Sequence, residues 1–335
     1  MDSLFAHLTA IVLSLFLAVF ASVEKRLIID TDIFSDVDDA GALLLASTLP
    51  RTCLIAVHVN VASSYSALAV SAILGHYGHG SVPIGLRRPI NNNHFFDSQG
   101  FELGEYASKV AYHWQGGSLR WNAVEEASEP VELYRKVLAA EDDGAVTIVS
   151  IGFLENLSAL LNSTADNLSP LPGPELIKAK VAKLVVMGGE YPSGYEFNFW
   201  GDNPLHTAHV VNNWPGKITF SGLKMGKNVV SGAKLTVEGP ANDPVRKAYE
   251  WYRFGEVFQY VNSYGYNHVF PNGSNTWVFD EGHTDQHWLE LRVDDATAGR
   301  ILDELYLKGA WSAVSGGMTG MEKAEPGELE AVLRR

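Results

Sequence analysis

Cysteine is nearly absent from this chain of 335 residues, in which Cys53 is the only one. A single thiol cannot form an intrachain disulfide, so the fold has to rest on its packed core. Hydrophobic residues make up 46% of the chain, which is enough for a large core and excludes wholesale disorder. Internal repeats and dividing linkers are also lacking. We expect one domain over residues 23–315 and a mobile Gly- and Glu-rich tail over 316–335.

Basic residues are scarce as well, because 25 Lys and Arg stand against 39 Asp and Glu, for a formal net charge of −14. An acidic chain repels a phosphate backbone, so this balance argues against a nucleic-acid partner and does not favour an anionic membrane surface. A neutral small molecule, or one that binds through a cation, suits the charge better. The composition leaves a homo-oligomer open.

Long hydrophobic runs are lacking except at the N-terminus. Residues 8–20 are mostly apolar, too few to span a bilayer comfortably, and the small Ala21 and Ser22 follow them. The pattern predicts a signal peptide over 1–22 and a secreted chain without membrane contact after cleavage. An uncleaved anchor is the alternative, since the first residues carry no Lys or Arg. Four sequons then permit N-glycosylation, the first of them in a segment that we expect to be buried: Asn156, Asn162, Asn167 and Asn272.

From residue 27 onward, short β-branched runs alternate with amphipathic segments of helix length. This pattern indicates an α/β fold, a doubly wound and mostly parallel sheet with helices on both faces and a Rossmann-like core. Strands are predicted at 27–29, 54–59, 82–86, 146–151, 183–187, 218–222 and, with a turn, 272–280. Helices are predicted at 39–48, 64–77, 131–140, 154–161, 204–212, 244–252 and 297–307, and a long loop at 91–130.

Polar residues and glycines follow several predicted strands at the point where each strand ends. Asp30 and Asp32 follow the first strand, Asn60 follows the second, and Gly152 and the glycine pair at 188–189 follow later ones. Ligands of doubly wound sheets bind outside the carboxyl ends of the strands. The sequence therefore predicts a ligand site at this edge of the sheet.

Five aspartates fall within ten residues after the first predicted strand: Asp30, Asp32, Asp36, Asp38 and Asp39. Such a group of carboxylates repels itself unless a cation neutralises it. Oxygen ligands without a nearby Cys or His favour calcium or magnesium over zinc. A helix start is the simpler explanation for part of the cluster, with Asp36 as the N-cap and Asp38 and Asp39 in the first turn. It leaves Asp30 and Asp32 unexplained.

Two other motifs fit the cluster poorly. An EF-hand loop needs an oxygen ligand at its fifth position and glycine at its sixth, where Phe34 and Ser35 stand. A phosphatase of the haloacid dehalogenase type also has an aspartate pair after strand one. The Gly-Thr that usually follows that pair is replaced here by Ile33-Phe34-Ser35.

The cluster resembles the signature DTDPGxDDAxAL of the inosine-uridine-preferring nucleoside hydrolases, in the DTDxxSDVDDA form of some members. It reads here Asp30-Thr31-Asp32-Ile33-Phe34-Ser35-Asp36-Val37-Asp38-Asp39-Ala40. Further blocks agree in order and spacing over roughly residues 27–252, and more weakly to about 310. They are Val59-Asn60-Val61, the segment 149–156, Val186-Met187-Gly188-Gly189, and Glu196-Phe197-Asn198 with Asp202.

The resemblance implies a nucleoside hydrolase-like fold and a calcium-dependent enzyme that hydrolyses the N-glycosidic bond of ribonucleosides to ribose and free base. It makes Asp32 the catalytic base and a calcium ligand, with Asp39 and the backbone carbonyl of Ile151 as further ligands. The resemblance also implies two groups of substrate-binding residues. The ribose hydroxyls would be contacted by Asp38, Asn60, Glu196 and Asn198, and the pocket would be lined by Met187 and Phe197.

Two departures from the family pattern bear on activity. Residues 190–195 contain no asparagine, although the family usually has one there. The family's last calcium ligand, an aspartate expected soon after the helix of residues 244–252, is missing, and Asp285 lies too late in the chain to replace it. The alternative to a working hydrolase is therefore a catalytically impaired member that binds calcium and a ribosyl ligand without turnover.

Overall fold

The computed structural model describes residues 24–34, 36–93, 106–252, 260–261, 265–280, 286–289 and 294–314. The predicted signal peptide, the predicted tail and Asp285 lie outside the described residues. No helix in the described part of the chain is both long and apolar enough to cross a membrane.

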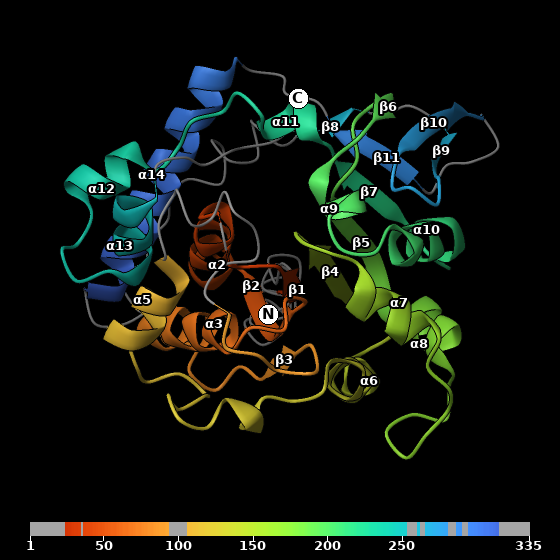
Figure 1. Ribbon diagram of the computed structural model, residues 1–335, viewed down its shortest axis with the longest axis horizontal. Helices are drawn as coiled ribbons and strands as arrows, with labels where there is room; N and C mark the ends of the chain where they lie inside the picture. The colour runs from red at the N-terminus through yellow and green to blue at the C-terminus, as the bar shows by residue number, and fades with distance from the viewer. Residues whose placement is uncertain are drawn as a thin grey trace, which may run out of the picture.

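An eight-stranded sheet forms the centre of the molecule, with the strand order β3-β2-β1-β4-β5-β7-β11-β8 (Figure 1). Neighbouring strands are parallel except for β11 and β8, which are antiparallel. The strands are β1 (Lys25–Thr31), β2 (Thr52–Val59), β3 (Ile84–Leu86), β4 (Val146–Ser150), β5 (Val181–Met187), β7 (Ile218–Ser221), β8 (Tyr260–Val261) and β11 (Gln286–Leu289). The predicted doubly wound, mostly parallel α/β fold is confirmed.

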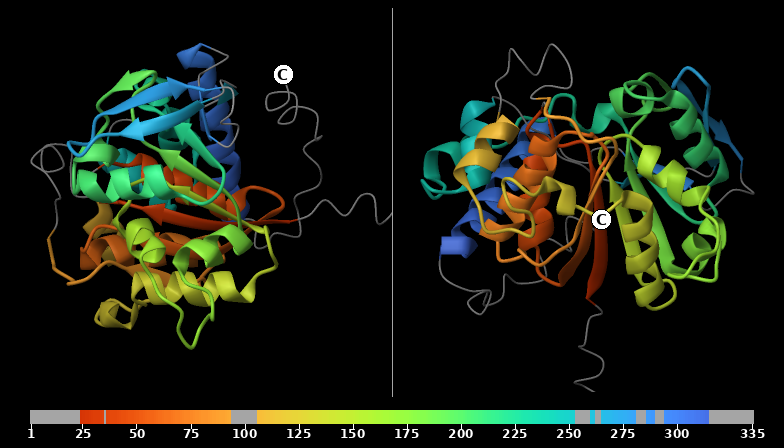
Figure 2. Two further views of the ribbon diagram at one scale, coloured as in Figure 1. Left: turned by 90° about the vertical axis from the view of Figure 1, so that its right-hand side faces the viewer. Right: turned by 60° about the horizontal axis from the view of Figure 1, so that its bottom comes forward.

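Both faces of the sheet are covered by helices, because the central strands are apolar on both faces. Ile29 packs into one hydrophobic core and its neighbour Ile28 into the other. Each buried branched side chain of this kind stabilises the fold by about 1.5–3 kcal/mol. The first core contains α2 (Asp38–Thr48), α3 (Ser64–His76), α5 (Tyr106–His113), α13 (Pro244–Trp251) and α14 (Asp295–Val314). The second contains α6 (Pro130–Ala140), α7 (Glu155–Leu161), α8 (Gly173–Lys180) and α10 (Pro204–Asn213) (Figure 2).

The strand order reverses between β1 and β4. The chain runs outward from β1 through β2 to β3 and then returns to the other side of β1 as β4. A switch of this kind leaves a crevice outside the carboxyl ends of the two central strands, which is where ligands of such sheets bind. These ends face the viewer in Figure 1.

A smaller sheet of three strands, in the order β6-β10-β9, lies beside α10 and β11. Its strands are antiparallel and comprise β6 (Ser193–Gly194), β9 (Gly265–Val269) and β10 (Asn275–Phe279). The structure also has three short helices, which are α9 (Phe197–Trp200), α11 (Leu223–Gly226) and α12 (Ala233–Glu238).

Each helix and strand predicted from the sequence is present, but the loop predicted over residues 91–130 is partly wrong. It contains α5 and a 3-10 turn, η1 (Val124–Glu126). The sides of α5 that carry Tyr106 and Val110 are buried, yet Gly- and His-rich flanks hide this short helical pattern in the sequence. The last helix is longer than predicted, and α8, β9 and β11 were missed, because elements this short carry little periodicity.

Candidate active site

The aspartate cluster lies where β1 ends and turns toward α2. Val37 occupies the N-cap position of α2, and no side chain caps this helix end. The prediction that Asp36 caps the helix is therefore wrong, because the helix begins one residue later than such a cap requires. The backbone carbonyl of Asp36 instead accepts a hydrogen bond of 2.5 Å from the buried Tyr106 hydroxyl.

Three carboxylates of the cluster converge. Asp36, Asp38 and Asp39 each offer one oxygen within 4.8 Å of the others. Asp39 is buried and accepts a hydrogen bond from the hydroxyl of Thr31, the last residue of β1. Burial raises the pKa of Asp39 well above its usual range, and the neighbouring charges of Asp32, Asp38 and Asp36 raise it further.

Asp32 stands against the end of β4. A Cβ atom added to Gly152 would lie 2.5 Å from the Asp32 amide nitrogen and 2.6 Å from its Oδ1 atom, so only glycine leaves room for this carboxylate. Burial raises the pKa of Asp32 well above its usual range, with additional increases from Asp36 and Asp38. The half-buried Ile151 precedes this glycine, and its carbonyl accepts a hydrogen bond of 3.3 Å from Asn198 Nδ2.

The segment that follows β5 supplies the opposite side of the site. Glu196 is the N-cap of α9, and its carboxylate accepts hydrogen bonds of 3.0 Å from the amides of Asn198 and Gly189. Burial raises the pKa of Glu196 to about 7, although these amide donors oppose the increase. The side chain of Asn198 also donates to the carbonyl and the sulfur of Met187, the last residue of β5.

An aromatic series borders this side. Phe153 is buried directly after Gly152, and its ring centroid lies 5.7 Å from that of Phe197. Phe197 is 36% exposed and contacts Trp200, which is 47% exposed, at 5.2 Å. The series therefore leads from the end of β4 outward to solvent, and it provides apolar surface beside the polar groups.

Asn60 is fully buried, and its side chain makes two hydrogen bonds beneath the site. Its Nδ2 donates to Asp30 Oδ1 at 2.7 Å, and its Oδ1 accepts from the Phe153 amide at 3.2 Å. This side chain joins the end of β2 to the ends of β1 and β4. Its predicted contact with ribose stays a prediction.

A buried polar layer lies under the site and was missed by the sequence reasoning. Asp30 accepts hydrogen bonds from Tyr134 at 2.8 Å and from Asn156 at 3.1 Å, besides the one from Asn60. Burial raises the pKa of Asp30 to about 7 against the effect of these donors. The imidazole of His58, the β2 residue opposite Asp30, stacks on the Tyr134 ring at 3.6 Å, and burial lowers its pKa to about 3. Only the expected burial of Asn156 pointed to this layer.

The family model of the inosine-uridine preferring nucleoside hydrolases matches residues 27–280 of this chain. The chain belongs to this family. Nucleoside hydrolases act on N-glycosyl bonds and are typically metal-dependent. A comparison with curated proteins finds no match.

Solved structures of nucleoside hydrolases share the fold. A plant nucleoside hydrolase has 17% identity and a TM-score of 0.59, over 85% of this chain and 99% of that one. The inosine-uridine preferring nucleoside hydrolase of Bacillus anthracis has 15% identity and a TM-score of 0.58, over 85% and 99%. An inosine-guanosine nucleoside hydrolase has 18% identity and a TM-score of 0.59, over 88% and 99%.

The donor set of this nucleoside hydrolase fits a hard divalent cation. Its groups are carboxylate and carbonyl oxygens, which calcium and magnesium prefer. Burial and mutual repulsion raise the pKa values of Asp32 and Asp39, and a bound cation would relieve both effects. The sequence prediction assigns such a cation to these two carboxylates and the Ile151 carbonyl, and it stays a prediction.

A second group of potential metal ligands already contains its own cation. Oxygen or nitrogen atoms of Glu155, Asp202 and His206 lie within 4.8 Å of one another. The guanidinium of Arg87 pairs with Glu155 and, at 3.1 Å, with Asp202, and it donates to the Asn60 carbonyl at 3.2 Å. Arg87 therefore offsets part of the negative charge of this group and ties the end of β2 to α7 and to the segment after α9.

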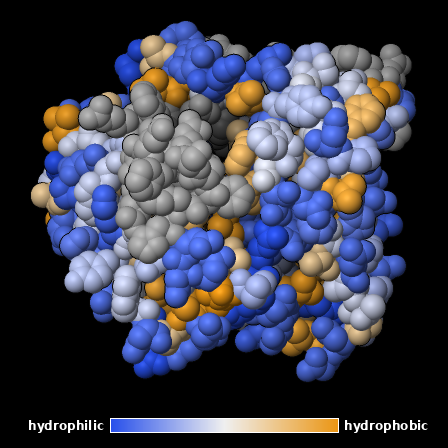
Figure 3. Space-filling view, in the orientation of Figure 1, coloured by the Kyte–Doolittle hydropathy of each residue, from blue (hydrophilic) through white to orange (hydrophobic). Residues whose placement is uncertain are grey.

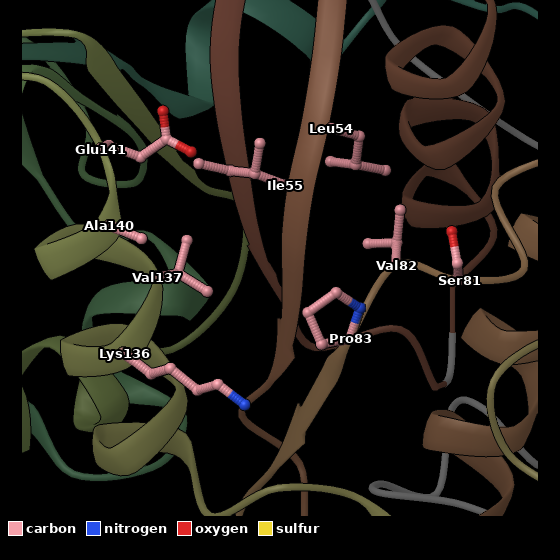
Figure 4. A pocket seen from close by; sticks show the side chains of 9 residues that line it. All are labelled: Leu54, Ile55, Ser81, Val82, Pro83, Lys136, Val137, Ala140 and Glu141. Carbon is pink, nitrogen blue, oxygen red and sulfur yellow. The ribbon is translucent and has the colours of Figure 1, made fainter. Parts of the chain in front are cut away.

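Figure 3 shows the face of the molecule at the carboxyl ends of the strands, where hydrophobic side chains gather near the middle between mostly hydrophilic flanks. An open pocket of about 360 Å³ lies elsewhere, beside the first half of β2 and the end of α6 (Figure 4). It is mostly apolar, and its Glu141 is held by Arg26 at 2.7 and 2.9 Å. That pocket offers no group of catalytic residues.

Proposed function

We propose that this nucleoside hydrolase cleaves the N-glycosidic bond of ribonucleosides in a calcium-dependent reaction that releases ribose and the free base. One observation carries the proposal. At the switch between β1 and β4, Asp32 lies against Gly152 and its charge acts on Asp39. Asn198 hydrogen-bonds the carbonyl of Ile151, the residue before that glycine. Carboxylates for proton transfer and polar groups for a sugar therefore meet at one edge of the sheet.

The carboxylates suit the charge that develops in the reaction. Hydrolysis of an N-glycosidic bond passes through an oxocarbenium-like ribosyl cation, which nearby negative charge stabilises. Asp32 would take the proton of the attacking water as general base. A bound calcium ion would contribute by orienting the ribose diol and by lowering the pKa of that water.

The remaining groups would bind the nucleoside. Asp38, Asn60, Glu196 and Asn198 would hydrogen-bond the ribose hydroxyls, while Met187 and Phe197 would line the pocket. The partly exposed ring of Phe197 offers a flat apolar face to a base. The net charge of −14 favours a neutral nucleoside over a charged nucleotide.

The test is release of free base by the purified protein from inosine, uridine and adenosine, with calcium and with a chelator. Release that the chelator abolishes and added calcium restores supports the proposal. Unchanged release in the chelator contradicts the calcium dependence, and release of phosphate from a nucleotide instead contradicts the reaction class.

A catalytically impaired member is the second candidate, and one observation favours it. Of the described carboxylates beyond residue 240, the buried Asp243 accepts hydrogen bonds from Tyr77 and the Arg246 amide, and Asp303 accepts one from the Gly232 amide. No described carboxylate beyond residue 240 belongs to the acidic group that Asp36, Asp38 and Asp39 form. Calcium-dependent thermal stabilisation without base release from any nucleoside would support this candidate.

We also propose that the chain is secreted after removal of residues 1–22 and is active as one domain, with or without self-association. Asn156 donates to Asp30 in the buried layer, so N-glycans would be confined to the exposed Asn162, Asn167 and Asn272. Mass spectrometry of the protein from a eukaryotic culture medium tests both points. A mature N-terminus before residue 20, or a glycan on Asn156, would contradict them.

A further inference from the structure

The guanidinium of Arg87 joins three segments at the carboxyl ends of the strands. It pairs with Glu155, the first residue of α7, and at 3.1 Å with Asp202, two residues after α9. It also donates to the carbonyl of Asn60, directly after β2, at 3.2 Å. A planar guanidinium has five N–H donors in fixed directions, so this one side chain can set the separation of several acceptors.

The backbone of Arg87 is itself fixed. Arg87 follows β3 directly, and its amide donates to the carbonyl of Val59, the last residue of β2, at 3.0 Å. The side chains of Arg87, Glu155 and Asp202 are 24%, 28% and 20% exposed. Because water screens ion pairs of this exposure, they contribute little to the free energy of unfolding. Arg87 therefore acts on the geometry of these segments more than on the stability of the fold.

Without the cation, the two carboxylates would repel each other. An oxygen of Glu155 lies within 4.8 Å of an oxygen of Asp202. Asp202 follows α9, a single turn in which the Gly201 amide donates to the Phe197 carbonyl at 2.7 Å. A displacement of Asp202 would therefore be passed through this turn to residues 196–198.

We propose that Arg87 is a positioning residue for the sugar, which holds Asn60 and residues 196–198 at the separation that the ribose of the substrate requires. This inference rests on the proposed function, because that function assigns Asn60, Glu196 and Asn198 to the ribose. Asp32 is held separately, against Gly152. Loss of Arg87 therefore weakens sugar binding more than it weakens proton transfer.

The test is the Kd of ribose, measured by isothermal titration calorimetry with calcium present, together with KM and kcat. The substrate is whichever of inosine, uridine and adenosine the protein hydrolyses fastest. Arg87→Met removes the guanidinium and keeps an unbranched apolar side chain. We expect this variant to raise the ribose Kd and KM by about tenfold and to leave kcat within about threefold, because it loses uniform binding of the sugar.

Three further variants sharpen the test. Arg87→Lys keeps the charge but not the planar set of donors, so its constants should lie between those of Arg87→Met and the unaltered protein. Asp202→Asn should also raise KM, and the double variant with Arg87→Met should raise it no further, because the two residues act as a pair. Arg120→Met is the matched control, since it removes an exposed arginine that pairs with Glu126, and it should leave all three constants unchanged.

The outcomes separate this inference from the function on which it rests. A ribose Kd and a KM of Arg87→Met equal to those of the unaltered protein would overturn the inference and leave the proposed function standing. A fall in kcat at constant KM would also overturn it, because a loss of folded enzyme gives that result. Additive effects of Arg87→Met and Asp202→Asn would contradict the pairing.

The ribose measurement decides the inference even where turnover is absent. If the unaltered protein binds ribose without releasing base, the proposed hydrolysis fails, and the ribose Kd of the variants still decides the role of Arg87. If it neither binds ribose nor releases base, both proposals fail. Thermal unfolding checks that each variant is folded, and Arg87→Lys and Asp202→Asn decide the matter if Arg87→Met is not.

Discussion

Gly152 determines where the carboxylate of Asp32 can lie. An added methyl group would approach the Asp32 amide nitrogen and Oδ1 atom to 2.5 and 2.6 Å, and β4 cannot retreat without disturbing the central sheet. We therefore predict that Gly152→Ala displaces Asp32 and lowers kcat by about a hundredfold, the effect that a misplacement of about 1 Å can have. Steady-state rates of base release measure this effect.

Gly216→Ala is the control for that substitution, because its added Cβ would have only ordinary contacts, at 3.6 and 3.9 Å from Trp214. This variant should keep its rate. Equal rates for Gly152→Ala and the unaltered protein would show that Asp32 does not need its observed position.

The sequence predicted the residues of a recognisable motif and missed those defined by packing alone. Asp32 and Asp39 belong to a string of unusual composition. In the structure Asp32 lies beside the end of β4, and Asp39 lies beside the end of β1. The helix-cap role of Asp36 was wrong because spacing alone does not show at which residue a helix begins. Tyr106 and Tyr134 come from helices far along the chain, and nothing local marks their contacts with the first loop and strand.

At the scale of elements, β1, β2 and α6 meet in the layer formed by Asp30, His58 and Tyr134. His58 has a pKa of about 3 in the fold and about 6.5 when exposed. Between these values the unfolded chain binds one more proton, so this residue contributes stability that is complete above about pH 6.5 and is lost as the pH falls. Asp30 acts in the opposite sense. Its pKa rises from 3.8 to about 7, so its contribution falls as the pH rises through that window.

Between about pH 4 and 6.5 the pH dependences that His58 and Asp30 give to the free energy of unfolding cancel. Removal of His58 should leave only the dependence caused by Asp30. We predict that the free energy of unfolding of His58→Gln, relative to the unaltered protein, rises by about 1.4 kcal/mol for each unit by which the pH falls in this window. Urea unfolding of the calcium-free proteins at several pH values measures it. Parallel pH profiles would show that His58 is not buried in the neutral form.

Helices and strands with a clear spacing of hydrophobic residues were predictable from the sequence, and short or irregular elements were not. β4 and β5 are apolar, bounded runs that pack on both faces, and α6 begins with a proline and an acidic cap. By contrast, α9 has four residues and β6 has two, so neither carries a readable pattern. The two elements nonetheless flank Glu196 and the aromatic series, so the sequence could place that side of the site only through the family resemblance.

At the scale of the whole molecule, calcium should stabilise the fold. A ligand that binds only the folded state adds about 2.7 kcal/mol when its free concentration is one hundred times its Kd. We predict that a chelator lowers Tm and that Asp39→Asn removes this dependence. The calcium-free variant should be at least as stable as the unaltered protein, because it no longer buries a carboxylate whose pKa is raised. Differential scanning calorimetry checks both points, and a Tm independent of calcium would contradict the metal site.

The sequence was sufficient for the doubly wound core, because alternating buried strands and helices admit few arrangements, but it did not predict the three-stranded sheet. The position of the site followed from the same topology, since ligands of such sheets bind at the switch between β1 and β4. The convergence of Asp36, Asp38 and Asp39 did not follow, because it depends on the path of one loop and on its anchor to α5.

The central claim is that Asp32 at the end of β1 performs the chemistry. The most direct measurement is the rate of base release by Asp32→Asn at saturating calcium, beside the unaltered protein and the charge-matched Asp142→Asn. Loss of a general base lowers a rate by about 10²–10⁴-fold, and we predict a loss in this range for Asp32→Asn with an unchanged rate in the control. A rate for Asp32→Asn within a few-fold of the unaltered protein would contradict the account.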